Sequence, residues 1–201
     1  MKDAVVDWAE RFILLLLFAS FAVANIRSED LINWVLVAME GITAFMVLIR
    51  RRAISVSMRP SDWLLAFGGT LLPLLMRPVV GGEALFAGAA ILATGLVIVG
   101  ATISFLAKMS LNRRMAIAPA NRGVQAKWAY AVVRHPMYAG YVVAQVGYLI
   151  HNPSWTNVAI YLCAWALQGV RIIREERHLS LDEEYRAYMR QTPFRLIPGV
   201  F

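Results

Sequence analysis

Six apolar stretches follow one another along the 201 residues, and each approaches the length that a helix needs to cross a lipid bilayer. That length is roughly 20 mostly apolar residues. Only 16% of the residues are charged, whereas about a quarter are charged in a soluble domain. The chain is therefore predicted to be an all-α, polytopic integral membrane protein, with helices near 11–26, 31–49, 63–80, 84–107, 137–150 and 155–173.

Positive charges are distributed unequally between the two sides that six spans define. Eighteen of the 20 Lys and Arg residues fall on the side of the chain ends, and only Arg27 and Arg77 fall on the other. Because short basic loops face the cytoplasm, we expect both termini to be cytoplasmic, in a bacterial inner membrane or the endoplasmic reticulum. Basic loops facing anionic membrane lipids account for the net charge of +7, and no nucleic acid is expected as a partner.

The chain divides into two unequal parts that form one integrated membrane domain. Residues 1–107 are a four-helix membrane region in which Gly95 and Gly100 favour close helix packing. Residues 108–201 hold a basic loop, a helical hairpin and a polar tail. In the tail, Ser180 to Glu183 has the form of a capping box, which predicts an amphipathic helix ending near Arg190. The one cysteine excludes an internal disulfide and a cysteine-built metal site, so no metal is expected. The sequence leaves the oligomeric state open.

The start of the fifth stretch carries the first candidate for chemistry. Pro136 suits the first position of a helix, and Arg134 and His135 directly precede it. A helix start with free backbone N–H groups is suited to a carboxylate or a phosphate. An ordinary helix start with an arginine at the lipid headgroups explains the same residues equally well.

Polar residues form one stripe on each of the last two apolar stretches. Each stripe spans an arc of roughly 80° on a helix. Polar groups at such depth face a partner or a cavity, so we expect a shared pocket near the cytoplasmic end and interhelical hydrogen bonds deeper in the membrane. The stripes are Tyr138, Tyr141, Gln145 and Tyr148 on the fifth stretch, and Asn157, Tyr161, Gln168, Arg171 and Glu175 on the sixth.

Glu40 is isolated from these residues in the sequence, at the middle of the second stretch. A carboxyl group at the bilayer centre costs several kcal/mol unless it is paired or protonated. Glu40 is therefore a functional candidate, either lining a substrate cavity or bonding a neighbouring helix.

Four short motifs carry a resemblance to a known family, and they lie at 134–140, 174–179, 184–188 and 195–199. In their order, they resemble the isoprenylcysteine carboxyl methyltransferase-like integral membrane methyltransferases, which are also similar to phospholipid N-methyltransferases. The resemblance covers about 108–201. It implies S-adenosylmethionine as methyl donor, a cytoplasmic cofactor pocket covered by the tail, and a lipophilic or lipid substrate that enters from the bilayer.

The same resemblance implies roles for individual residues. His135 and Tyr138 would contact the cofactor, the two glutamates of the sixth stretch would close its pocket, and an arginine would orient the acceptor or the cofactor carboxylate. The family often has Gly-Pro-Tyr before the Arg-His-Pro element, whereas this chain keeps only the tyrosine of that pattern, in Trp128-Ala129-Tyr130. Trp128 and Tyr130 remain candidates for stacking on the adenine. The candidate catalytic residues are Arg171, Arg174 and Glu40, and the candidate cofactor-binding residues are His135, Tyr138, Arg134, Tyr130, Trp128, Glu175 and Glu176.

Two other functions fit the sequence. Membrane reductases that use NADPH on a sterol-like or enone lipid are similar in the same half, and Arg113, Arg114 and Arg122 would then contact the pyrophosphate. A non-catalytic membrane subunit that binds a partner is the other alternative. The chain has no GxGxxG, P-loop, HExxH or GxSxG motif, which disfavours a soluble nucleotide-binding or hydrolase domain.

Overall fold

The computed structural model describes residues 2–26, 30–49, 55–56, 59–79, 85–111, 120–121 and 124–200. Within these residues the fold is helical, apart from an antiparallel pairing of two dipeptides, Ser55–Val56 (β1) and Ala120–Asn121 (β2). The α-helices are α1 (Lys2–Ile26), α2 (Leu31–Ile49), α3 (Pro60–Leu71), α4 (Ala89–Leu111), α5 (Pro136–His151), α6 (Trp155–Leu179) and α7 (Glu183–Gln191), and the short 3₁₀ helices are η1 (Leu72–Leu75) and η3 (Trp128–Ala131).

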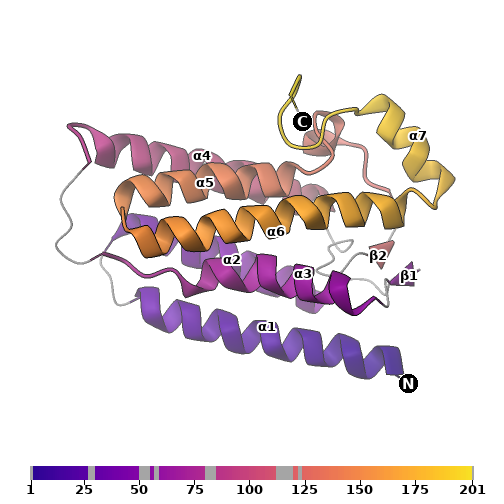
Figure 1. Cartoon of the computed structure of the whole chain (residues 1–201), viewed down its shortest axis with the longest axis horizontal. Helices are drawn as coiled ribbons and strands as arrows, with labels where there is room; N and C mark the ends of the chain where they lie inside the picture. Colours follow the sequence, from indigo (N-terminus) through magenta and orange to yellow (C-terminus); the bar gives the residue numbers. More distant parts are fainter. Residues whose placement is uncertain are drawn as a thin grey trace.

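Helices α1 to α6 lie side by side along one axis, and the short helix α7 covers one end of the bundle (Figure 1). The chain begins and ends at this same end, where β1 and β2 also lie. The start of α5 and the end of α6 meet there as well. The motifs at 134–140 and 174–179 are therefore close in space although about 40 residues separate them.

Three helices, α2, α4 and α6, are long and apolar enough to cross a membrane, and α1 contains a shorter apolar segment, Arg11–Val23. Apolar side chains such as Phe12, Leu16 and Ile91 point outward from the bundle, and Ile91 is 82% exposed. An outer surface of this kind suits lipid rather than water. The prediction of an all-α fold is thus confirmed, and the three apolar helices support a membrane protein. The number of six spans and the cytoplasmic location of both termini stay predictions.

The third apolar stretch is broken where its proline lies. Helix α3 ends at Leu71, and Pro73 occupies the first turn of η1, after which the chain becomes extended at Met76. Proline lacks the N–H group that a helix interior needs. This break shortens α3 and brings Thr70 and Pro73 to the inside of the bundle, where both line a cavity.

The tail helix begins later than the capping-box prediction placed it. Ser180 is the residue that ends α6, and its backbone N–H donates to the carbonyl of Glu176. Asp182 is the N-cap of α7, because its side chain accepts a hydrogen bond from the backbone N–H of Glu184. The predicted box was wrong because α6 runs to Leu179 and uses Ser180 as its own final residue.

Helices α4 and α5 form the closest pair in the fold, and glycines allow their approach. A Cβ built on Gly100 of α4 would lie 2.4 Å from the backbone nitrogen of Ala144, and one on Gly140 of α5 would lie 2.6 Å from that of Ser104. Backbone atoms cannot move aside as a flexible side chain can. Small residues thus fix α5 against α4, which is the packing role that the sequence predicts for Gly100. The same prediction for Gly95 is wrong, because a Cβ built there meets nothing within 4 Å.

We expect the substitution Gly100→Val to separate α4 from α5 and to destabilise the protein by about 1–3 kcal/mol, the usual cost of overpacking. Gly95→Val is the matched control on the same helix, since nothing lies within 4 Å of a Cβ built there. The measurement is the thermal unfolding midpoint of each purified variant in the same detergent. Equal midpoints for the two variants would contradict this account of the packing.

The hairpin formed by α5 and α6 is splayed. Helix α5 packs mainly on α4, whereas α6 packs mainly on α3 and η1. Ser154 caps α6 by accepting from the backbone N–H of Asn157, which keeps the turn between the two helices short. The polar stripes of the two helices consequently face a space between them rather than an apolar contact.

Candidate functional site

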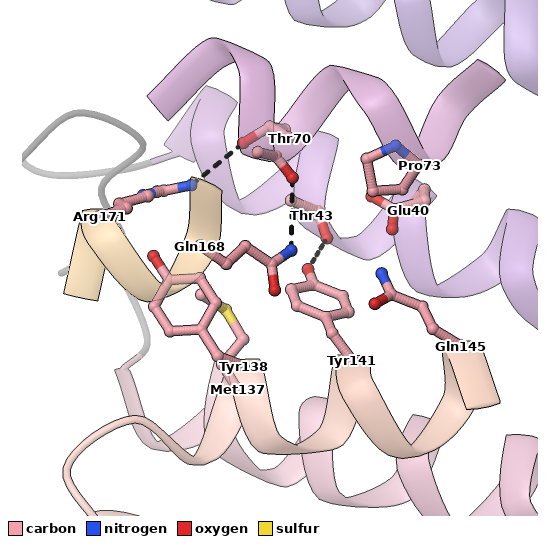
Figure 2. Close-up of a pocket in the computed structure, with 11 residues that line it drawn as sticks. Glu40, Thr43, Thr70, Pro73, Met137, Tyr138, Tyr141, Gln145, Gln168 and Arg171 are labelled. Atoms are coloured by element: carbon pink, nitrogen blue, oxygen red, sulfur yellow. Dashed lines mark hydrogen bonds between the residues drawn. The ribbon is translucent and has the colours of Figure 1, made fainter. Parts of the chain in front are cut away.

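A cavity lies between α2, α3, α5 and α6, and both polar stripes contribute to it. It is partly open, and about 450 Å³ of space between its side chains and in the adjoining solvent is not filled by protein atoms. Figure 2 shows its lining side chains converging from the surrounding helices. This polar cavity is lined by Glu40, Thr43, Gly69, Thr70, Pro73, Met137, Tyr138, Tyr141, Gln145, Gln168 and Arg171.

Hydrogen bonds hold several of these side chains in place. The hydroxyls of Thr43 and Tyr141 are 3.0 Å apart, and Arg171 Nη1 donates to Thr70 Oγ1 at 3.2 Å (Figure 2). Gln168 Nε2 donates to the carbonyl of Gly69 at 3.3 Å. The other amide atom, Gln168 Oε1, is buried and has no partner among the described residues, which makes it an acceptor available to a ligand in the cavity.

Glu40 lines the same cavity from α2, at the end away from Arg171 (Figure 2). Its carboxylate has no hydrogen bond or ion pair within the described part of the chain. Lys108 interacts with Glu40 electrostatically. The Lys108 ammonium donates to the Met39 carbonyl at 2.9 Å and lies 4.9 Å from the centre of the Tyr141 ring. Lys108 therefore offsets part of the charge of Glu40 without bonding its oxygens.

At the opposite end, two lining residues lie beside two more that were singled out from the sequence. The guanidinium carbon of Arg171 lies 5.3 Å from the centre of the Tyr138 ring, and the Tyr138 hydroxyl donates to Glu175 at 3.4 Å. The His135 ring is 5.7 Å from the Tyr138 ring. A cation, an aromatic face and a carboxylate thus lie around one end of the cavity, beside the start of α5.

Glu176 is the centre of a buried ion cluster next to this end. Its Oε1 accepts from Arg134 Nε at 2.6 Å and lies 3.1 Å from His135 Nε2, while its Oε2 accepts from Arg195 Nε at 2.9 Å. The side chains of Arg134 and Glu176 are only 4% and 5% exposed. Both carboxylate oxygens of Glu176 are therefore engaged by the protein itself.

This cluster joins the tail to the loop before α5. Arg134 Nη1 donates to the carbonyls of Thr192 and Pro193, and the backbone N–H of His135 donates to the carbonyl of Arg195 at 2.8 Å. Tail helix α7 adds a side-chain contact, because the hydroxyl of Tyr188 donates to the carbonyl of Tyr130 at 2.7 Å.

Burial raises the pKa of Tyr188 above its usual range. The phenol therefore stays protonated and keeps donating this bond at any physiological pH.

Two candidate residues lie away from the cavity. Trp128 is 81% exposed and has a left-handed backbone with φ of 59°, so its ring is not brought to Tyr138. Arg174 is directed to α3, where its Nη1 donates to Asp62 at 3.3 Å.

Tyr130 is buried with Tyr138 and the tail tyrosines in one apolar cluster. The expected pyrophosphate ligands Arg113, Arg114 and Arg122 lie outside the described residues.

Comparison with known families gives an independent assignment for this half of the chain. Residues 85–181 match the model of the isoprenylcysteine carboxyl methyltransferase (ICMT) family. The resemblance to the ICMT family is thereby confirmed. No curated protein matches the chain significantly. The ICMT match runs across α4, α5 and α6, the helices that carry both polar stripes and Glu176.

The cavity also includes residues that lie outside the ICMT match. Glu40 and Thr43 come from α2, and Thr70 and Pro73 come from α3 and η1. Of these, only Glu40 was singled out from the sequence. Thr43 lies three residues after Glu40 and so shares its helix face, which is a signal that could have found it. Lys108 gave no such signal, because its sequence position suggests a cation at the end of a span rather than a buried one.

Proposed function

We propose that this protein is an integral membrane S-adenosylmethionine-dependent methyltransferase that acts on a lipophilic acceptor entering from the bilayer. Membership of residues 85–181 in a methyltransferase family supports a methyl-transfer enzyme. The observation that carries the proposal is the polar cavity, in which an arginine, an aromatic face and the unpartnered acceptor Gln168 Oε1 surround one partly open space.

The residues around the cavity suit the chemical groups of the methyl donor. S-adenosylmethionine supplies a methyl group on a sulfonium cation, together with a carboxylate, an ammonium and a ribose diol. The guanidinium of Arg171 suits a carboxylate, and the face of Tyr138 suits a cation. Glu175 and Gln168 Oε1 are acceptors suited to an ammonium or a hydroxyl group.

We assign the remaining candidates to positions around this donor site. His135 and Tyr130 would bound it beside Tyr138, and Arg134 and Glu176 would hold the tail over it through their buried ion pair. Arg174 and Trp128 would contribute only at its rim. Transfer between bound reactants depends mainly on alignment and exclusion of water, so no covalent nucleophile is required.

The membrane arrangement is part of the proposal. We infer six spans with both termini and the donor site facing the cytoplasm, in a bacterial inner membrane or the endoplasmic reticulum. The location of both chain ends, α7 and the basic end of α6 at one end of the bundle supports this orientation (Figure 1). Contributions to the cavity from both 1–107 and 108–201 support one integrated membrane domain.

Titration calorimetry on the full chain in detergent tests the proposal, with S-adenosylhomocysteine and NADPH as the two probes. We expect S-adenosylhomocysteine to bind with roughly micromolar affinity and NADPH not to bind. Binding of NADPH alone would replace the proposal with a membrane reductase. Binding of neither probe would indicate a non-catalytic membrane subunit.

A further inference from the structure

The described part of the tail ends in a tight turn that presents two apolar side chains. The backbone N–H of Val200 donates to the carbonyl of Ile197 at 3.1 Å, and Gly199 has a φ of 81°. Pro198 followed by a glycine with this φ is the pattern of a type II turn. Ile197 is 55% exposed and Val200 is 77% exposed. This terminal turn, residues 197–200, therefore carries its apolar groups on the outside of the fold.

A second group of exposed apolar side chains lies just before α5, in and next to η3. Trp128 and Val132 are 81% and 60% exposed. Leu196, which directly precedes the terminal turn, packs against the apolar cluster that contains Tyr130 of η3. The terminal turn and η3 are therefore adjoining segments, and both present apolar groups outward.

The position of the terminal turn along the bundle is close to the edge of a membrane. Figure 1 shows the end of the chain beside the start of α5, whereas α1 and α6 extend further along the axis. Helix α5 has 16 residues, which at about 1.5 Å each make about 24 Å, less than the roughly 30 Å of the hydrocarbon core. Since α5 packs along α4, a helix long enough to cross the membrane, the start of α5 lies near the boundary between hydrocarbon and headgroups.

We propose that the terminal turn, together with Trp128 and Val132, inserts into the lipid layer at this end of the bundle, at the depth of the headgroups. Tryptophan is enriched at this depth, and apolar side chains beside cations are typical of interfacial segments. Lys127 is exposed and directly precedes Trp128, so that its ammonium is placed to bind the phosphate of an anionic lipid. The inference does not depend on methyl transfer.

Continuity with the outer surface of the bundle favours lipid over a second protein as the occupant. The 3₁₀ helix η3 packs on α4, which exposes Leu106 and Met109 near the same end. The exposed groups of η3 therefore extend an outer surface that already suits lipid. The turn also suits this environment, because the N–H of Val200 is bonded within it and an unbonded N–H is costly in lipid.

Site-directed spin labelling measures the depth of the terminal turn. Cys163→Ser removes the one native cysteine, and a single nitroxide-labelled cysteine then replaces Ile197 or Val200. Val99, 52% exposed on α4, gives the reference position in hydrocarbon, and Gln191, exposed at the end of α7, gives the reference in water. The full chain is placed in nanodiscs of phosphatidylcholine and phosphatidylglycerol. Accessibility is measured to oxygen, which partitions into lipid, and to a nickel chelate, which stays in water.

We expect the ratio of oxygen to nickel accessibility at 197 and 200 to be several-fold above that at 191 and below that at 99. A ratio equal to that at 191 would overturn the proposal. Labels that are shielded from both reagents and broadened by spin–spin interaction would place a second copy of the chain there, which also overturns it.

A charge variant tests the part of Lys127. In the mixed nanodiscs, Lys127→Gln should make the label at 200 shallower, whereas in phosphatidylcholine alone it should have no effect. Arg190→Gln, at an exposed position of α7, is the matched control and should leave the depth unchanged in both. The same depth for Lys127→Gln and wild type in the mixed nanodiscs would overturn the assignment of Lys127 to a lipid phosphate.

Discussion

Changing Glu176 to Gln is expected to release the tail from the bundle and to lower the free energy of unfolding by about 3–5 kcal/mol, the range for breaking a buried ion pair by removing one partner. The carboxylate bonds Arg134 and Arg195 and lies beside His135. A neutral amide of the same shape leaves the buried guanidinium of Arg134 without a counter-charge. We expect the effect on Arg134 to dominate, because the Arg195 side chain is 32% exposed and remains partly hydrated.

Chemical denaturation in detergent measures the stability change, and limited trypsin digestion reports the tail directly. Arg186 and Arg190 are exposed sites on α7 that should be cut faster in Glu176→Gln than in wild type. Glu183→Gln on the same helix is the control. Arg195→Leu should have a smaller effect than Arg134→Leu. Wild-type stability and trypsin resistance in Glu176→Gln would show that the cluster does not hold the tail.

Donor affinity is a second readout of the same variant. The family resemblance implies a direct contact between Glu176 and the cofactor. The engaged oxygens of Glu176 favour an indirect role, in which Glu176 positions the tail over Tyr138. In both cases S-adenosylhomocysteine should bind more weakly to Glu176→Gln. Arg134→Leu also removes contacts that hold the tail. If Glu176 acts by positioning the tail, Arg134→Leu should weaken S-adenosylhomocysteine binding to a similar degree. An unchanged affinity in Glu176→Gln would exclude Glu176 from the donor site.

Local signals in the sequence predicted the last two long helices and the existence of the cavity. Pro136 marks where α5 begins, and this signal depends only on neighbouring residues. The polar stripes predicted a shared pocket because a helix repeats every 3.6 residues, and Tyr138, Gln145, Gln168 and Arg171 all line it. Which residues share a face depends only on the repeat of one helix, so the sequence predicts it without knowledge of the packing between helices.

Contacts between distant segments could not be predicted in the same way. Thr70 reaches the cavity because Pro73 ends α3 early and α3 packs on α6, which no local pattern reveals. The binding partner of Glu176 was equally hidden, since Arg195 is 19 residues further along the chain. A carboxylate near several arginines has many possible partners, and only the docked tail selects among them.

The sequence also could not decide whether Arg171 or Arg174 faces the cavity, because this depends on packing between distant helices. The two are three residues apart and share a helix face, so the sequence left both open. In the structure Arg174 pairs with Asp62 of α3, and Arg171 faces the cavity beside Tyr138. The packing of α6 against α3 separates their roles.

Arg171→Gln is therefore expected to weaken S-adenosylhomocysteine binding by about 30-fold or more. Truncating one partner of a buried, hydrogen-bonded charge pair costs about 2–5 kcal/mol, and each 1.4 kcal/mol corresponds to a factor of ten. Arg171 is 5% exposed, so water contributes little to replacing its interaction with the donor carboxylate. Glutamine keeps one polar N–H group for Thr70, which limits the disturbance of α3.

Arg174→Gln is the matched control one turn further along α6. Its guanidinium is one-third exposed and bonds Asp62, so the substitution should change donor affinity less than about threefold, in line with the small contribution of a partly exposed ion pair. Titration calorimetry on both variants, with thermal unfolding to confirm that each is folded, measures the contrast. Equal losses in the two variants, or a larger loss in Arg174→Gln, would move the donor site away from the polar cavity and toward the end of α6, since the cavity is lined by Arg171 and not by Arg174.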